Sequence, residues 1–337
     1  MSPTCAATGY RLAKLGFCRS STEHRSLMAA APRARPEDFF SPDEWRALTT
    51  RSRWRGLWLV FHCWGVIGLA MVAGVLWPLT LPLGVLVVGA RQLGLFILMH
   101  DAAHGLLHPN RRVNDTLARW FCSSSLSDYR PYHLQHHRYV QQAEDPDLPL
   151  SAPFPISRVS LRRKLLRDLS GQTFFKQRLG PLLDSARARR SSAAPRLQRS
   201  QELVRGQRFL VGNALGFAVF AAAGYGWLWL VLWLLPMASW LPLISRVRNI
   251  AEHALVGQGE ADPLRQARTT HAGWGARALL APYWVNYHGE HHLFTQLPCW
   301  QLPRAHALLR RQGSAARMEI QPGYAAVLAL ATAAPSR

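Results

Sequence analysis

Residues 79–104 read LTLPLGVLVVGARQLGLFILMHDAAH, an apolar run that ends in two histidines spaced four residues apart. A helix needs about twenty predominantly apolar residues to cross a bilayer, and this run is long enough. On such a helix His100 and His104 would lie on the same face, one turn apart. The segment therefore predicts a membrane-spanning helix that brings two imidazoles to one edge of the membrane.

Three further clusters carry histidines at helical spacing: HLQHH at 133–137, NIAEH at 249–253 and HGEHH at 288–292. Imidazole is a ligand of first-row transition metals, and nine imidazoles are too many for one ion. We therefore predict a two-metal site. The predicted ligands are His100, His104, His133, His136, His137, His253, His288, His291 and His292. Asn249 lies one turn before His253 and would reach a metal through a water molecule.

The composition is that of an integral membrane protein. The 337 residues carry a formal net charge of +21, yet 49% are hydrophobic, and the two kinds of residue are segregated along the chain. We predict four transmembrane helices in two hairpins, at about 56–77, 79–99, 209–225 and 226–244, the last helix continuing to His253. Lysines and arginines flank these runs, which is typical of the positive-inside pattern and of anionic lipid headgroups. No nucleic-acid-binding pattern accompanies the charge, so we expect no nucleic-acid partner.

Both hairpins would leave and re-enter the membrane on the same side, which places all four histidine clusters on one face. Because the arginine-rich segments lie on that side, we predict that the metal site and both termini are cytoplasmic. Ser41, Pro42 and Glu44 form the pattern of a helix N-terminus with a capping box. We therefore expect a disordered extension at 1–38, a membrane domain at 39–312 and a C-terminal tail at 313–337.

Acidic residues beside the histidines are candidates for orienting them. Asp101, Glu252 and Glu290 each neighbour a histidine in sequence, and a helical neighbour points about 100° away, so they suit the outer shell better than the metal itself. Asp145 could orient the second cluster, or could be a turn residue before Pro146. The isolated histidines are expected to be structural: His24, His62, His271 and His306. We also exclude His108, because Pro109 should end the helix there.

The donor set indicates which metal the site would hold. The five cysteines are scattered and form no CxxC pair, so neither a zinc ribbon nor a disulfide scaffold is expected. Zinc usually takes three or four ligands, whereas nine imidazoles at two centres fit iron with positions left open for O2. Such a centre could oxidise an unactivated C–H bond in a lipid chain. No catalytic residue separate from the metal ligands is predicted.

These motifs resemble those of the integral-membrane fatty acid desaturase family. Residues 100–105 (HDAAHG), 133–137 (HLQHH) and 286–294 (NYHGEHHLF) resemble its three histidine boxes, and Asn249 with His253 resembles its additional ligand pair. The resemblance covers about 39–309. It implies four transmembrane helices under a cytoplasmic helical cap and a di-iron centre. It also implies that O2 and two external electrons convert a saturated acyl chain of a membrane lipid or acyl thioester into an alkene.

Two features leave alternatives open. The chain has no His-Pro-Gly-Gly signature of a fused cytochrome b5, so electrons would come from a separate ferredoxin or cytochrome b5-like donor. Hydroxylases and ketolases of alkanes, carotenoids or other lipids share much of the ligand set, although the end of the third box, His292-Leu293-Phe294, favours desaturation. A non-catalytic metal carrier would instead place ionisable groups along a path through the spans.

Overall fold

The computed structural model describes residues 30–122, 126–151, 153–178, 180, 196–257 and 260–333, without the side chains of 196–205. Contacts divide the chain into Met1–Ala30 and Ala31–Arg337, and the description below concerns the second unit. Most of the predicted extension at 1–38 lies outside the described residues. Its last part, just before the capped helix, contains a short 3-10 helix, Pro36–Asp38.

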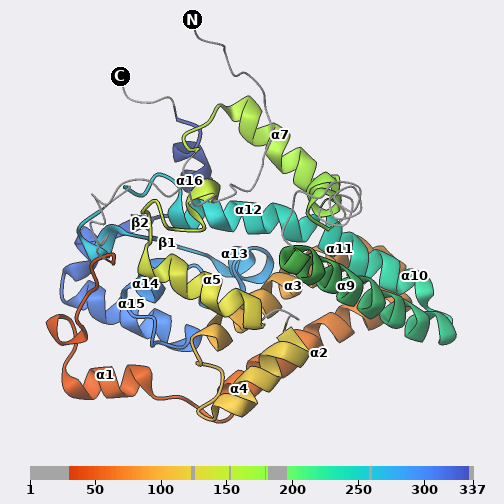
Figure 1. Cartoon of the computed structure of the whole chain (residues 1–337), viewed down its shortest axis with the longest axis horizontal. Helices are drawn as coiled ribbons and strands as arrows, with labels where there is room; N and C mark the ends of the chain where they lie inside the picture. The colour runs from red at the N-terminus through yellow and green to blue at the C-terminus, as the bar shows by residue number, and fades with distance from the viewer. Residues whose placement is uncertain are drawn as a thin grey trace, which may run out of the picture. The chain divides into compact units, whose positions relative to one another are not determined.

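The described part of the chain is mostly helical (Figure 1), as the sequence predicts. The N-terminal half contains α1 Pro42–Thr49, α2 Arg55–Leu76, α3 Leu81–Ala103, α4 Arg111–Leu117, α5 Leu126–Arg138, α6 Leu148–Ser151 and α7 Arg158–Leu169. The C-terminal half contains α9 Arg196–Ala222, α10 Gly226–Trp229, α11 Leu235–Ala238, α12 Trp240–His253, α13 Trp274–Leu279, α14 His288–Leu293, α15 Leu302–Arg311 and α16 Tyr324–Leu330. Short π segments, Ala118–Cys122 and Leu230–Leu234, follow α4 and join α10 to α11.

Three helices in the described chain are long and apolar enough to cross a membrane: Arg55–Leu76, Pro78–Ala103 and Gly226–His253. The first two pack against each other as α2 and α3, and α3 also contacts α12. The third runs from α10 to the end of α12, which confirms that the helix predicted at 226–244 continues to His253. The C-terminal ends of α3 and α12 therefore both carry histidines that are predicted to bind metal.

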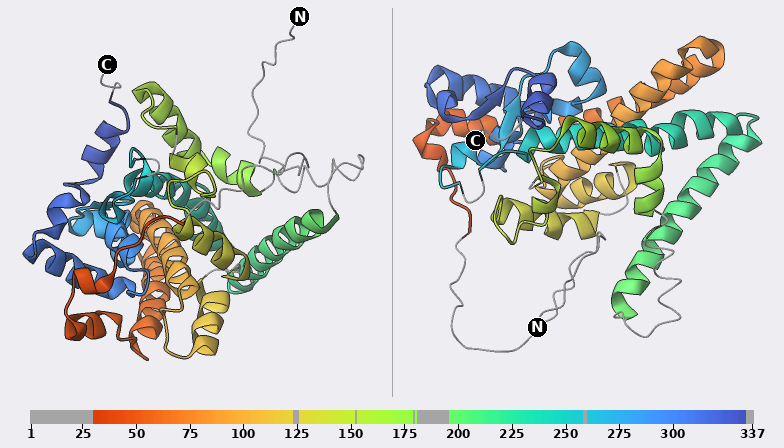
Figure 2. Two further views of the ribbon diagram at one scale, coloured as in Figure 1. Left: turned by 60° about the vertical axis from the view of Figure 1, so that its left-hand side comes forward. Right: turned by 90° about the horizontal axis from the view of Figure 1, so that it is seen from above.

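The predicted span at 209–225 is not among these three helices. It corresponds to the second half of α9, whose apolar part begins at Phe209 and ends with the helix at Ala222. That part rises about 21 Å at 1.5 Å per residue, less than the roughly 30 Å hydrocarbon core of a bilayer. In Figure 2, α9 meets α10 at one end and diverges from the longer helix beyond it, and the Phe220 and Trp229 rings make the contact, 5.3 Å apart.

Helix α1 is stabilised by its own N-terminal cap and by ring contacts with Phe294. Ser41 Oγ accepts from the backbone N–H of Glu44 and the Glu44 carboxylate accepts from the N–H of Ser41, so the predicted capping box is confirmed. Phe294, at the end of the third histidine cluster, is 1% exposed, and the rings of Phe40 and Trp45 contact it at 5.0 and 5.6 Å. Phe294 therefore anchors the N-terminal region on α14.

A small sheet was not anticipated from the sequence. Strand β1, Arg268–Thr270, pairs in parallel with β2, Glu319–Gln321, and Thr269 lies opposite Ile320. Strands of three residues carry no alternating pattern to detect, because their pairing depends on segments about 50 residues apart. The segment after 313, expected to be a tail, thus contributes β2 and also α16, which packs on α12.

Two polar residues in the middle of α3 are held inside the protein. Arg91 is 8% and Gln92 is 3% exposed. The guanidinium of Arg91 donates to the carbonyl of Ala278, and the Gln92 amide donates to the carbonyl of Trp233. Neighbouring protein therefore supplies hydrogen-bond acceptors that a bilayer lacks.

Candidate metal centre

Four helices carry the predicted histidines to one place in the fold. His100 and His104 lie at the C-terminal end of α3 and His253 ends α12, while the second and third clusters lie on α5 and α14. In Figure 1 these helix ends converge near the middle of the unit. All nine histidines predicted as ligands are therefore brought together.

The imidazoles form two groups, and the ligand nitrogens within each lie within 4.8 Å of one another. The first group consists of His100, His104, His133, His137 and His291, and the second of His136, His253, His288 and His292. On α5, His133 and His137 belong to the first group, and His136, which lies between them in sequence, belongs to the second. Helix α14 shows the reverse pattern: His288 and His292 belong to the second group and His291 to the first. The groups adjoin, since the rings of His137 and His292 are 4.3 Å apart.

The spacing of the nitrogens fits metal ligands. The Nε2 atom of His133 lies 2.8 Å from Nε2 of His104 and 2.9 Å from Nε2 of His137, and in the second group the Nε2 atoms of His253 and His288 are 2.8 Å apart. Two nitrogens about 2.1 Å from one metal and 90–110° apart on it would be separated by about 3.0–3.4 Å, close to these values. A neutral imidazole carries one N–H. Nitrogens converging in this way cannot all be paired with one another, whereas a cation would satisfy every lone pair.

Burial keeps most of these imidazoles neutral, as metal ligation requires. His133, His137, His288 and His291 are each 3–7% exposed. Burial, with the neighbouring imidazoles adding to it, lowers their pKa values well below the usual 6.5. Burial likewise lowers the pKa of His104 to about 4.

His136 differs because a carboxylate faces its second nitrogen. Burial alone would lower its pKa, but the hydrogen bond and charge of Asp145 raise it above the usual value. Nδ1 of His136 lies 2.7 Å from Asp145 Oδ1, and Asp145 also accepts from the backbone N–H groups of Gln141 and Asp147. An Nδ1–H bonded to a carboxylate leaves Nε2 unprotonated and aimed at the second group. Among the acidic candidates, Asp145 makes the shortest contact with a histidine of the two groups.

The other two carboxylates at these helix ends make longer contacts. Asp101 Oδ1 is 3.5 Å from Nδ1 of His100, and its second oxygen accepts from the backbone N–H of Cys299. Glu252 Oε1 is 3.6 Å from Nδ1 of His288 and 2.7 Å from Nε of Arg248. Asp101 therefore ties α3 to the loop before α15, and Glu252 ties α12 to α14.

Glu290 contacts neither histidine group. It is fully buried, lies 2.6 Å from Nδ1 of His306, and accepts from the hydroxyl of Thr269. It therefore joins α14 to α15 and β1, and His306 serves this structural contact. His108 also lies outside both groups, where its Nδ1 accepts from the backbone N–H of Asn110. His62 faces the hydroxyl of Tyr283 instead, and His24 lies outside the described residues.

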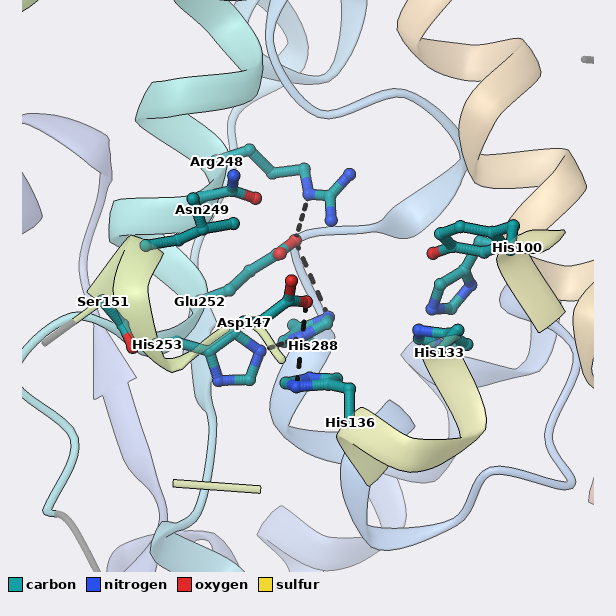
Figure 3. Close-up of a pocket in the computed structure, with 12 residues that line it drawn as sticks. His100, His133, His136, Asp147, Ser151, Arg248, Asn249, Glu252, His253 and His288 are labelled. Atoms are coloured by element: carbon teal, nitrogen blue, oxygen red, sulfur yellow. Dashed lines mark hydrogen bonds and ion pairs between the residues drawn. The ribbon is translucent and has the colours of Figure 1, made fainter. Parts of the chain in front are cut away.

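A cavity of about 30 Å³ adjoins both histidine groups (Figure 3). Asn249, predicted to reach a metal through a water molecule, is one of the residues that line it. Arg248 and Tyr129 also line it, and neither residue was predicted from the sequence. An arginine close to a membrane span is usually interpreted as facing lipid headgroups, which explains why Arg248 was missed. The Tyr129 ring stacks on His133, 5.1 Å away and within 9° of parallel.

Buried imidazoles without thiolates, held at the ends of membrane-length helices, define a class of membrane protein that could hold non-haem metal ions. Comparison with known families agrees: the fatty acid desaturase family matches residues 76–324. The chain therefore belongs to the fatty acid desaturase family, which consists of membrane-bound non-haem di-iron enzymes.

Similar proteins within this family act on different substrates. The chain is 28% identical to a dihydrorhizobitoxine desaturase of Bradyrhizobium elkanii, over 74% of this chain and 70% of that protein. It is 26% identical to a beta-carotene ketolase of Paracoccus sp. (strain PC1), over 73% of this chain and 86% of that protein. A ketolase of another Paracoccus strain is 25% identical. These likenesses support an oxidoreductase and leave open whether it desaturates or oxygenates.

Proposed function

We propose that this protein is a membrane-bound desaturase that introduces a C=C bond into an acyl chain of a lipid or acyl thioester. The observation that carries the proposal is the pair of buried histidine groups, which have metal-ligand spacing and adjoin a cavity at the ends of α3 and α12. A family match over residues 76–324 supports the same chemistry.

The two groups would hold two iron ions, one each. The first group would supply five imidazoles; the second would supply four, with Asn249 completing it through a water molecule. When bound, the iron ions would supply the redox chemistry that activates O2. The protein would hold the imidazoles neutral by burial and would orient His136 through Asp145 and His288 through Glu252.

The proposed reaction balances with two electrons from outside the chain. A –CH2–CH2– unit, O2, two electrons and two protons give –CH=CH– and two water molecules. Family membership implies a lipid substrate and an external electron donor in general. We propose a separate ferredoxin or cytochrome b5-like donor, which the net charge of +21 would favour if the donor is acidic.

We further propose four transmembrane helices, namely α9 and the three membrane-length helices, together with a cytoplasmic cap that carries the site. The lipid-facing character of α2 supports a bilayer setting, because Phe61 and Leu69 are 68% and 70% exposed. The apolar half of α9 is similar, with Leu215 62% and Val219 68% exposed. Tilt or local thinning of the bilayer would accommodate its short apolar stretch. The arginine-rich segments would place the site and both termini in the cytoplasm. We propose that the membrane domain begins near 39 and includes the segment after 313, because β2 pairs with β1 and α16 packs on α12.

The test is lipid profiling of a host that expresses the full chain together with a matching electron donor. We expect new unsaturated chains with the wild-type protein and none with His136→Ala. A matched control is His108→Ala, because His108 continues the spacing of the first cluster yet lies outside both groups. Unchanged lipids in a host whose donor is active would contradict the proposal.

Oxygenation by the same centre is the second candidate, because two of the similar proteins are beta-carotene ketolases. A hydroxylation would consume the same O2, electrons and protons and give one alcohol and one water. Mass spectrometry of the same extracts separates the outcomes, since desaturation lowers the substrate mass by two hydrogens and hydroxylation adds one oxygen.

A further inference from the structure

The cavity beside the histidine groups has a charged lining. Besides five imidazoles, it is lined by Arg248, Glu252 and Asp147. Its volume of about 30 Å³ is roughly twice the 10–15 Å³ that one water molecule needs, so a group with two polar atoms fits there. An apolar chain passing through such a space would desolvate charges and offer them no partner. The lining therefore suits a small polar end group of a substrate.

Arg248 has unused hydrogen-bonding capacity in this cavity. Within the described part of the chain, Glu252 is the only carboxylate within 4.0 Å of its guanidinium, and the contact is made at Nε. The two atoms are 2.7 Å apart but do not meet in hydrogen-bond geometry. No hydrogen bond joins the terminal nitrogens to another described residue. Figure 3 shows that the terminal nitrogens of Arg248 point away from its own backbone, toward the part of the pocket between His288 and His133.

The charge balance favours an anion once metals are bound. Glu252 and Asp147 together oppose the single positive charge of Arg248, which leaves the lining with a formal charge of about −1. Two divalent ions on neutral imidazoles would outweigh this and become the largest local charges. An additional carboxylate would then be attracted both by the ions and by the free edge of Arg248.

We propose that Arg248 binds a carboxylate of the substrate in this cavity, so that the bond to be oxidised lies a few carbon atoms from an acidic group. A guanidinium presents a planar fork that matches a carboxylate bidentately. The inference rests on the proposed function, because it takes the histidine groups as the reaction centre. It replaces the esterified acyl chain of the proposed function, which has no free carboxylate, by a saturated chain that carries a free acidic group near the reacting carbons.

The test measures binding without turnover. Isothermal titration calorimetry of the full-length, iron-loaded protein in detergent, with no electron donor, compares hexanoate with 1-hexanol, which has the same chain length and no charge. Three variants are titrated in parallel: Arg248→Met, the double variant Arg248→Met/Glu252→Gln, and Arg112→Met. The double variant avoids leaving Glu252 as an unpaired buried charge. Arg112 is an exposed residue on α4 and controls for the general loss of one positive charge.

We expect the wild-type protein and Arg112→Met to bind hexanoate more tightly than hexanol. Both Arg248 variants should lose hexanoate affinity by about tenfold to a hundredfold, the value of a hydrogen bond to a charged group, while hexanol binding stays unchanged. Equal binding of the two probes by the wild type, no binding of hexanoate, or an undiminished hexanoate preference in the double variant would overturn the proposal. A lost preference in the Arg248 variants together with unchanged host lipids would uphold this site and refute the desaturation.

Discussion

Replacement of Asp145 by asparagine tests how the second histidine group is held. Asp145 is 5% exposed and accepts three hydrogen bonds, from Nδ1 of His136 and from two backbone N–H groups. An asparagine has one acceptor oxygen, so its NH2 must face one of these donors. A lost hydrogen bond to a charged group is worth about 1.5–3 kcal/mol, which corresponds to a roughly tenfold to hundredfold loss of metal affinity. Removal of a metal ligand's hydrogen-bond partner typically has an effect of this size.

The assay is competition for iron between the protein and a chelator of known affinity, with iron content measured at equilibrium. Asp147→Asn is the matched control, because Asp147 is 3.7 Å from Nδ1 of His136 and its side chain is 27% exposed. We expect Asp147→Asn to change iron affinity by less than about fivefold, because an ion pair with a partly exposed carboxylate is worth below about 1 kcal/mol. The reasoning is refuted if Asp145→Asn holds iron as tightly as the wild type, or if both variants lose it equally.

Three further perturbations have defined outcomes. Glu290→Gln should lower the free energy of unfolding by about 1–3 kcal/mol in thermal denaturation, because it alters the buried hydrogen-bond partner of His306. Iron content should stay at the wild-type value, and a loss of iron would mean that Glu290 supports the metal site. Gly94→Ala should destabilise the protein by about 1–3 kcal/mol, because the added Cβ would lie 2.6 Å from the Tyr283 ring. Gly65→Ala should leave stability unchanged, because no atom lies within 4 Å of its added Cβ, and equal melting temperatures of the two variants would contradict the packing. The metal-free protein should lose stability as the pH falls below about 6.5, because burial lowers the pKa values of the clustered imidazoles in the folded protein. In this pH range these imidazoles bind protons only in the unfolded chain. A melting temperature that stays constant from pH 7 to pH 5 would count against this.

Local rules predicted the elements that depend on neighbours in sequence. The capping box at Ser41 and Glu44 needs three residues and one helical turn, and it forms as predicted. The continuation of the last long helix to His253 followed from hydrophobic length in the same way. The strand pairing of Thr269 with Ile320 had no such signal, because it depends on a contact between distant segments.

Roles that depend on two helices meeting were harder to predict. Asp101, Glu252 and Glu290 look alike in sequence, each beside a histidine. In the structure Glu290 faces His306, whereas Glu252 lies near His288 and Arg248. Sequence gives the direction of a side chain around its own helix axis, but the element that packs against that face decides its partner.

The sequence by itself determined that histidines gather at the ends of apolar helices, because helical periodicity places residues three and four apart on one face. It also determined the donor type and the number of imidazoles available for two metals. Only the tertiary structure decided that His133 and His137 join one group while His136 joins the other, and that Arg248 faces the cavity between them. The physical reason is that periodicity fixes angles within a helix, whereas a metal-sized space and its charges exist only where several helices pack together.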